Sequence, residues 1–145
     1  MCFLTLFCTS FKLYKALVFA AFIPYLSGAI GVVARLFLTP DQVNSETLNR
    51  VFEQGIHNNL VDRGFQEAYY STSDEVVSSF SNNGFSKVLL RSVRGWGGSM
   101  AEQIYKLKDE NPEIHKTVID LINKTATEPS IIDMCWHAIY IGCKQ

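Results

Sequence analysis

An uncharged, strongly apolar stretch near the N-terminus places the firmest limit on how this chain can fold. No charged residue occurs from Ala16 to Ala34, a run of nineteen residues in a chain of 145. A membrane-spanning helix needs about 20 apolar residues, so the run approaches that length. Pro24, Gly28 and Gly31 interrupt it, and these residue types disfavour one continuous helix.

Three interpretations of this stretch are open. The first is a membrane-spanning helix. The second is a signal peptide, in which Lys12 and Lys15 precede an apolar core and small residues follow at 27–29. The third, slightly favoured, is a pair of helices over about 11–26 and 29–38 that is buried in a soluble domain.

Composition predicts one domain, over 1–145, and argues against one class of partner. With 48% hydrophobic content, a chain of this length can bury roughly two-thirds of the surface of its unfolded form. The net charge is −1, and the 13 lysines and arginines form no run. Because nucleic-acid binding depends on clustered positive charge, no nucleic-acid partner is expected.

Residue chemistry indicates neither a metal site nor a catalytic site. The four cysteines lack CxxC spacing, and no two of the three histidines are four residues apart. The acidic pairs stand at predicted helix ends, where carboxylates favour the helix dipole, and no nucleophile or base is placed beside them. We therefore expect no catalytic residue, no metal and no cofactor, and we favour a binding module over an enzyme.

Helix signals recur along the rest of the chain. Thr39-Pro40 is typical of a helix start, Thr72 and Glu75 have capping-box spacing, and Asn83-Gly84 is typical of a turn. No segment alternates with a period of two, so no strand is predicted. The expected architecture is all-α, with about seven or eight helices around one core. Apolar residues at three- and four-residue spacing predict helices over about 40–60, 72–80, 85–93, 99–108, 114–122 and 131–139.

A glycine-rich segment interrupts this helical pattern. Trp96 lies among Gly95, Gly97 and Gly98, between two predicted helices. Because glycine lowers helix stability, the backbone is expected to turn here or to be closely approached by another element. The segment is therefore either a helix corner closed by a core tryptophan or part of a binding site.

The segment 85–98 resembles the first homology region of the Bcl-2 family of apoptosis regulators. In that family an apolar helix leads into Asn-Trp-Gly-Arg, and Trp96 and Gly97 match the second and third members of this tetrad. Gly95 stands at the Asn position and Gly98 at the Arg position, and both are departures from the pattern.

Two further segments extend the resemblance to about 48–140. Trp136 is similar in place to the tryptophan of the second homology region, with His137 where the family has Asp. Gly55 matches the glycine of the third region and precedes Trp96 by 41 residues, close to the family's spacing. The resemblance implies structural roles for Gly55, Trp96 and Trp136, and it is nearer to a divergent viral pro-survival homologue than to a cellular member.

The resemblance implies both a fold and a function. The fold would be a Bcl-2-like all-α bundle with a central hydrophobic helix and a surface groove. The groove would sequester the amphipathic helix of pro-apoptotic family proteins and so inhibit apoptosis in the cytoplasm, in association with mitochondria or other intracellular membranes. A homodimer and attachment to a membrane through 1–38 are open possibilities. The matched groove residues are Phe65, Tyr69, Phe85, Val88, Leu89, Arg94, Gly97, Gly98, Ala101 and Tyr105.

The missing arginine predicts an altered groove. In the family it pairs with an aspartate of the ligand, and such a charge-assisted contact contributes about 1.5–3 kcal/mol. Gly98 therefore predicts weaker or more selective binding unless Arg91 or Arg94 reaches the same carboxylate. Two alternatives remain: a pro-apoptotic, pore-forming member of the same fold, and a small membrane-anchored or secreted helical protein unrelated to apoptosis.

Overall fold

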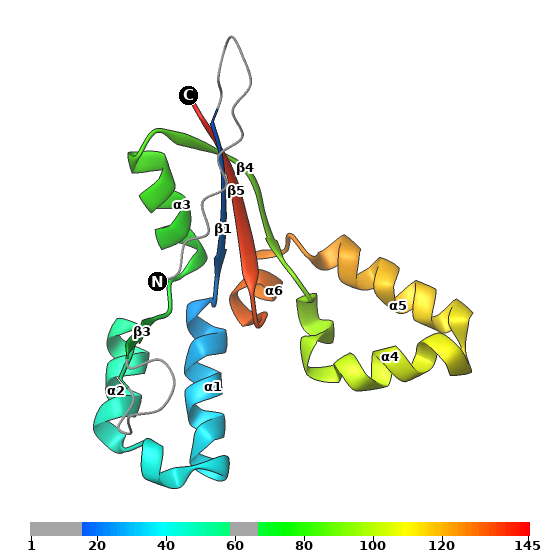
Figure 1. The fold of residues 1–145 in the computed structure, drawn as a ribbon, viewed down its shortest axis with the longest axis horizontal. Coiled ribbons are helices and arrows are strands. Elements are labelled where there is room, and N and C mark those ends of the chain that lie inside the picture. Colours follow the sequence, from blue (N-terminus) through cyan, green and yellow to red (C-terminus); the bar gives the residue numbers. More distant parts are fainter. Residues whose placement is uncertain (1–15, 59–66) are drawn as a thin grey trace.

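The computed structural model describes residues 16–58 and 67–145, which form a mixed fold of helices and strands (Figure 1). Short 3-10 helices η1 and η2 occur among the longer elements. In chain order the elements are β1 (Leu17–Phe22), α1 (Tyr25–Leu38), η1 (Pro40–Gln42), α2 (Ser45–Gln54), β2 (Ile56–Asn58), β3 (Glu67–Tyr69), α3 (Ser73–Asn82), β4 (Phe85–Ser92), η2 (Gly95–Met100), α4 (Ala101–Glu110), α5 (Pro112–Thr125), α6 (Pro129–Met134) and β5 (Ala138–Lys144).

A three-stranded sheet lies at the centre, in the order β1-β5-β4. Strand β5 is antiparallel to both neighbours, so β1 and β4 run parallel to each other. Tyr140 in β5 pairs with Ala20 on one side and with Leu90 on the other. Helix α3 lies along one side of this sheet, and α4 and α5 extend away from it on the other (Figure 1). Strands β2 and β3 form a separate antiparallel pair.

The prediction of an all-α, Bcl-2-like bundle is wrong, because the described residues contain five strands in two sheets. The predicted helix over 85–93 is strand β4. The pairing of β4 with β5 shifts register between Lys87 and Leu89, which leaves Val88 as the extra residue of a bulge. One extra residue breaks the two-residue alternation of a strand, so Phe85, Val88 and Leu89 have helical spacing in the sequence.

The predicted helix over 131–139 is also wrong. Helix α6 ends at Met134, and strand β5 begins at Ala138. Within β5, Ala138, Tyr140 and Gly142 are buried, while the residues between them are partly exposed. Burial therefore alternates strictly along the strand, but two of the three buried residues are small, so hydrophobicity does not alternate visibly in the sequence.

The uncharged N-terminal stretch divides into a strand and a helix. The predicted helix over 11–26 is wrong in its described part, where β1 is a strand, and residues 11–15 lie outside the described part. The predicted helix over 29–38 is confirmed as part of α1, which begins earlier, at Tyr25. Pro24 separates the two elements with extended backbone angles, φ −63° and ψ 149°. None of the described helices combines the length and the hydrophobicity that crossing a membrane requires.

Several signals of helix ends are confirmed. Thr72 and Glu75 form the predicted capping box of α3, and Gly84 follows this helix with φ +76°. Helices α4 and α5 lie where helices were predicted over 99–108 and 114–122. These signals depend on residues that are close in sequence, which explains their accuracy.

Helix α2 is shorter than predicted. Its cap is Asn44, whose side chain accepts a hydrogen bond from the amide of Thr47, and not Thr39. Gly55 ends the helix in the left-handed conformation, with φ +70°. The prediction that Gly55 lies inside a helix over 40–60 is wrong, because the chain continues beyond it as strand β2.

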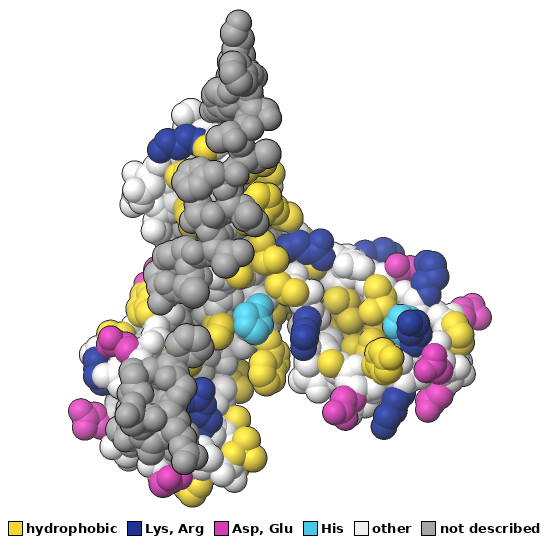
Figure 2. Space-filling model, viewed as in Figure 1, with side chains coloured by type: hydrophobic (Ala, Val, Ile, Leu, Met, Phe, Trp, Pro, Cys, Tyr) yellow, Lys and Arg dark blue, Asp and Glu magenta, His cyan; other side chains and the backbone are white. Residues whose placement is uncertain are grey.

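The core lies between the central sheet and helices α1, α2, α3 and α6. Ala20, Val76 and Tyr140 are buried together, with partly buried neighbours from β1, α3 and β4. A second cluster joins α1 and α2 to Tyr70, and a third surrounds Cys135. Helices α4 and α5, here called the arm (Ala101–Thr125), bury no residue. Figure 2 shows hydrophobic side chains gathered on the visible face of this arm.

Candidate functional site

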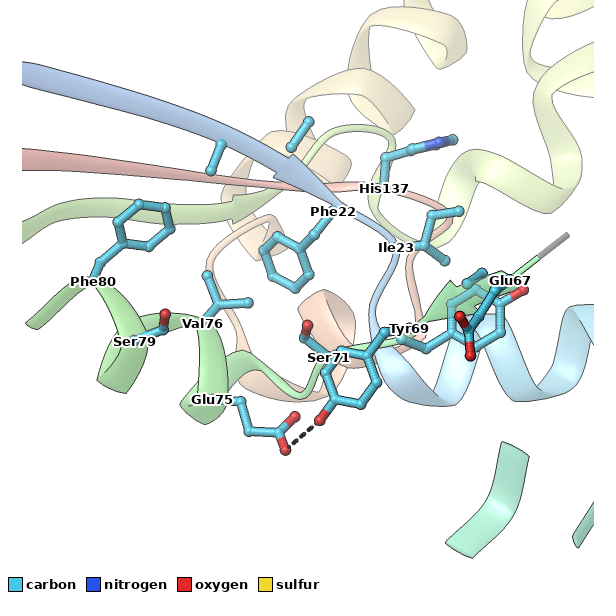
Figure 3. A pocket seen from close by; sticks show the side chains of 14 residues that line it. Phe22, Ile23, Glu67, Tyr69, Ser71, Glu75, Val76, Ser79, Phe80 and His137 are labelled. Carbon is cyan, nitrogen blue, oxygen red and sulfur yellow. Dashed lines mark hydrogen bonds between the residues drawn. The ribbon is translucent and has the colours of Figure 1, made fainter. Parts of the chain in front are cut away.

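A cavity of about 390 Å³ lies between the carboxyl end of β1, strand β3 and helix α3 (Figure 3). Pro24 and Ser71 form an isolated bridge, and the amide of Tyr25 donates to the carbonyl of Ser71 at 2.9 Å. These two contacts hold the residues after β3 beside the end of β1. They bring together segments that are 46–47 residues apart in the chain.

Apolar side chains form most of the wall of this cavity. Phe22 and Val76 enter it from the sheet and from α3, and aromatic rings of Tyr69 and Phe80 lie nearer its ends (Figure 3). The lining contains two carboxylates and, within the described part of the chain, no lysine or arginine. It consists of Ala20, Ala21, Phe22, Ile23, Glu67, Ala68, Tyr69, Tyr70, Ser71, Glu75, Val76, Ser79, Phe80 and His137.

The carboxylate of Glu75 is held in place by three donors. Its Oε2 accepts from the amide of Thr72 at 2.8 Å and from the Thr72 hydroxyl at 3.1 Å, and its Oε1 accepts from the hydroxyl of Tyr69 at 2.7 Å. The Thr72 amide is the main cause that lowers the pKa of Glu75, and the Tyr69 hydroxyl adds to it. The same contact with Glu75 raises the pKa of Tyr69. At neutral pH the cavity therefore has a fixed negative charge beside a protonated phenol.

Tyr70 anchors β3 to helix α1. Its ring lies directly over Gly28, where an added Cβ atom would stand 2.2 Å from the ring carbon Cγ. The amide of Tyr70 donates to the carbonyl of Gly55 at 2.8 Å, and burial raises the pKa of its hydroxyl. Gly28 thus permits the close approach of β3 and α1 that closes one side of the cavity.

The structure does not gather the ten predicted groove residues in one place. Tyr69 lines the cavity, whereas Phe65 lies outside the described residues. Phe85, Val88 and Leu89 belong to strand β4, not to a groove-forming helix. The remaining predicted groove residues, which do not line the cavity, are Arg94 before η2, Gly97 and Gly98 within it, and Ala101 and Tyr105 in α4.

The glycine-rich segment lies where the arm meets the rest of the molecule. An added Cβ atom on Gly97 would stand 2.5 Å from Cδ1 of Ile122 in α5 and 2.9 Å from Cδ1 of Ile104 in α4. On Gly98 it would stand 3.0 Å from the ring of Trp136. These glycines therefore allow a close contact between elements of the same chain, as expected from the loss of helix stability at glycine. The segment is not the corner between two helices that was one alternative, because strand β4 precedes it and Trp96 is only partly buried.

The two tryptophans matched to the family, and the two arginines that could replace its missing arginine, lie near the contact between η2 and the arm. Trp96 is partly buried within η2, and Trp136 is 60% exposed after α6. Arg91 donates to the side-chain oxygen of Asn123 in α5 at 3.2 Å. Arg94 precedes η2, and its Cβ would lie 3.7 Å from a Cβ added to Gly98. Arg91 thus links β4 to the arm.

The sequence contains two signals for residues of this cavity, but neither predicts the cavity itself. The capping box identified Glu75, but only as a helix cap. The uncharged run that contains Phe22 and Ile23 predicts a helix, whereas Phe22 ends strand β1 and Ile23 follows it. The remaining lining residues meet through strand pairing and through the packing of α3 on the sheet, and neither leaves a signal in the local sequence.

Within 16–58 and 67–145, no three histidine, cysteine or acidic side chains are grouped so that they could hold a metal ion. No protein-family model matches the chain, and no curated protein is significantly similar to it in sequence. The arrangement of the cavity itself is therefore the basis for a functional proposal.

Proposed function

We propose that this chain is a binding module that takes a small ligand with an apolar body and a positively charged group in the cavity between β1, β3 and α3. The observation that carries this proposal is the combination of apolar walls with an ordered carboxylate, in a lining whose described residues include no lysine or arginine. Ligand sites are typically mostly apolar, with a few placed polar groups that fix orientation.

The volume of the cavity limits the size of the ligand. At about 390 Å³ it falls near the lower end of the usual range for small-molecule sites, which is about 300–1,000 Å³. A single aromatic or short aliphatic body fits this space. Phe22, Val76 and Phe80 offer the apolar contact surface for it.

The charge of the cavity favours an amine over an acid. Glu75 stays ionised at neutral pH because its pKa is lowered, and Glu67 is a second carboxylate in the lining. A ligand carboxylate would meet these negative charges without a lysine or arginine in the described lining, which is unfavourable at short range. An ammonium group beside Glu75 would instead gain a charge-assisted hydrogen bond.

A matched pair of probes tests the charge preference. 4-Phenylbutylamine and 4-phenylbutyrate have similar apolar bodies and opposite charges, and each can be titrated into the protein while NMR shifts are followed. We expect the amine to bind at least about tenfold more tightly than the acid, a difference of about 1.4 kcal/mol. Equal affinity of the two probes, or no binding of either, would overturn the proposal.

Neighbouring serines on α3 provide a matched pair of variants. Ser79 lines the cavity and Ser78 does not, and both side chains are exposed. Ser79→Trp should fill the mouth of the cavity and abolish binding of the amine. Ser78→Trp adds the same ring outside the cavity and should leave the affinity unchanged.

Sequestration of a pro-apoptotic amphipathic helix stays a separate prediction. It rests on the sequence match at Trp96 and Gly97, and the fold that it presupposed is not the fold described above. Calorimetry with a panel of pro-apoptotic helix peptides tests it directly. Absence of heat with every peptide would remove it, while the amine titration would be unaffected, so the two hypotheses can be distinguished.

A further inference from the structure

A buried serine adds a second polar group to the wall of the cavity between β1, β3 and α3. Ser71 lines this cavity and is only 5% exposed. Among residues 16–58 and 67–145, its hydroxyl has no hydrogen-bond partner. Figure 3 shows this hydroxyl pointing into the cavity, towards the ring of Phe22. Because buried polar groups in proteins are nearly always hydrogen-bonded, the Ser71 hydroxyl points to a partner that enters the cavity.

The main chain fixes the position of this hydroxyl. The carbonyl of Ser71 accepts from the amide of Tyr25 at 2.9 Å, and Ser71 forms an isolated bridge with Pro24. On the other side, Thr72 is the capping residue of helix α3. Ser71 is therefore held from both directions without the use of its side chain. A hydroxyl that is fixed in this way is preorganised to bind a ligand.

The carboxylate of Glu75 leaves little capacity for orienting a ligand. An ionised carboxylate has about four acceptor positions. The amide and hydroxyl of Thr72 and the hydroxyl of Tyr69 each donate to this group. The capacity that remains gives an ammonium group a single direct hydrogen bond, which fixes its place but not the direction of the apolar body. A second polar contact with Ser71 fixes that direction.

The two polar groups differ in depth. Glu75 is exposed, whereas Ser71 is buried. An ammonium group beside Glu75 therefore stays in contact with water, which satisfies its other hydrogens. The group that reaches Ser71 belongs instead to the apolar body of the ligand. A serine hydroxyl can both donate and accept, so a neutral hydroxyl on the ligand can pair with it in either role.

We propose that the cavity is selective for an amino alcohol, meaning an amine whose apolar body carries one hydroxyl group, and that Ser71 recognises this hydroxyl. The inference rests on the proposed function, since the contact of the ammonium group with Glu75 places the body beside Ser71. A site with a buried hydrogen-bonding group discriminates against a ligand that lacks the matching hydroxyl, because the buried group is then left unpaired.

A set of matched amines tests this selectivity. The parent compound is 4-phenylbutylamine, and each derivative carries one hydroxyl group on one of the three chain carbons that are not bonded to nitrogen. The parent and the separate enantiomers of each derivative are titrated into the full chain while NMR shifts are followed. We expect at least one derivative to bind about threefold or more tightly than the parent, the usual effect of one neutral hydrogen bond.

Two buried serines provide matched variants. Ser71→Ala removes the hydroxyl but keeps the contacts that hold this residue, since they use the main chain. It should weaken binding of the preferred alcohol to the level of the parent amine. Ser92 is also buried, its hydroxyl has no partner within the described part of the chain, and it does not line the cavity. Ser92→Ala should therefore leave the preference for the alcohol unchanged.

The outcomes separate this inference from the proposed function. The inference is overturned if no alcohol binds more tightly than 4-phenylbutylamine, or if the preference survives Ser71→Ala. It is also overturned if Ser71→Ala weakens the parent amine and the alcohol equally, because the serine then affects only the shape of the cavity. In each of these cases the parent amine still binds, and the proposed function stands. Failure of every amine to bind overturns both.

Discussion

The sheet body and the arm contrast both in how they are stabilised and in how their sequence encodes them. All three buried clusters lie in the body, around the central sheet and helices α1, α2, α3 and α6. The arm buries no residue in either of its helices, and Tyr105, Ile114 and Leu121 remain 69%, 49% and 46% exposed. The body is thus held by packing between distant segments. The arm is held by the contact of α4 with α5, which follow each other in the chain, and by the contacts of both helices with η2.

The largest expected difference between these regions comes from removing one large side chain from each. Tyr140 is fully buried and stacks on Phe80 with ring centroids 4.5 Å apart. Tyr140→Ala should lower the free energy of unfolding by about 3–5 kcal/mol, because it leaves a cavity in the core. Leu121→Ala in the arm should cost less than about 1 kcal/mol. Urea unfolding measures both, and equal losses would contradict the contrast.

The same contrast explains which parts of the fold could be predicted from the sequence. The arm helices and α3 were predicted correctly because their signals lie within a few residues, as with Thr72 and Glu75. The sheet was missed because its evidence is distributed over the chain. Tyr140 becomes central only when Ala20 and Leu90 stand on either side of it, and no local pattern records that pairing.

The predicted groove residues are not gathered in one place for a related reason. Most predicted groove residues fall between 85 and 105, where their order in the chain is not their arrangement in space. The observed cavity needs the ends of β1, β3 and α3 together, and the bridge between Pro24 and Ser71 joins the chain after β1 to the chain after β3. The sequence predicts Tyr69 in a helical groove, but Tyr69 lies in β3 and lines the cavity between β1, β3 and α3. The prediction that another element closely approaches the glycine-rich segment is confirmed at Gly97. The approaching side chains belong to α4 and α5 of the same chain.

Two glycines in helix α1 differ in their surroundings, because Gly28 lies against the ring of Tyr70 and Gly31 faces open space. Gly28→Ala would drive a methyl group into the ring of Tyr70 and should destabilise the protein by about 1–3 kcal/mol. Gly31→Ala is the control, since no atom lies within 4 Å of the added methyl group. Alanine favours helix by about 1 kcal/mol over glycine, so this variant should be neutral or more stable. Thermal unfolding distinguishes them, and similar melting temperatures would show that Tyr70 does not need this space.

The smallest expected effect concerns Glu75, where a local helix signal also belongs to the cavity. The folded protein lowers the pKa of this carboxyl below its ordinary value of 4.5, mainly through the amide of Thr72 and then the hydroxyl of Tyr69. A lowered pKa means that the ionised group stabilises the folded state above about pH 4.5 and that this contribution is lost as the pH falls through the folded pKa. Because the side chain is exposed, solvent screening limits the contribution to a few tenths of a kcal/mol.

Glu75→Gln isolates this contribution, since glutamine can still accept the capping hydrogen bond but does not titrate. The difference in unfolding free energy between the unmodified protein and this variant should be constant from about pH 6 to 8 and should vanish towards pH 3. Other carboxyl groups titrate in both proteins and cancel in the difference. Tyr69→Phe removes one of the donors that lower the pKa, so the loss should begin at a higher pH in that variant. A difference that does not depend on pH would mean that Glu75 acts only as a neutral cap, and the fixed charge assigned to the cavity would have to be abandoned with it.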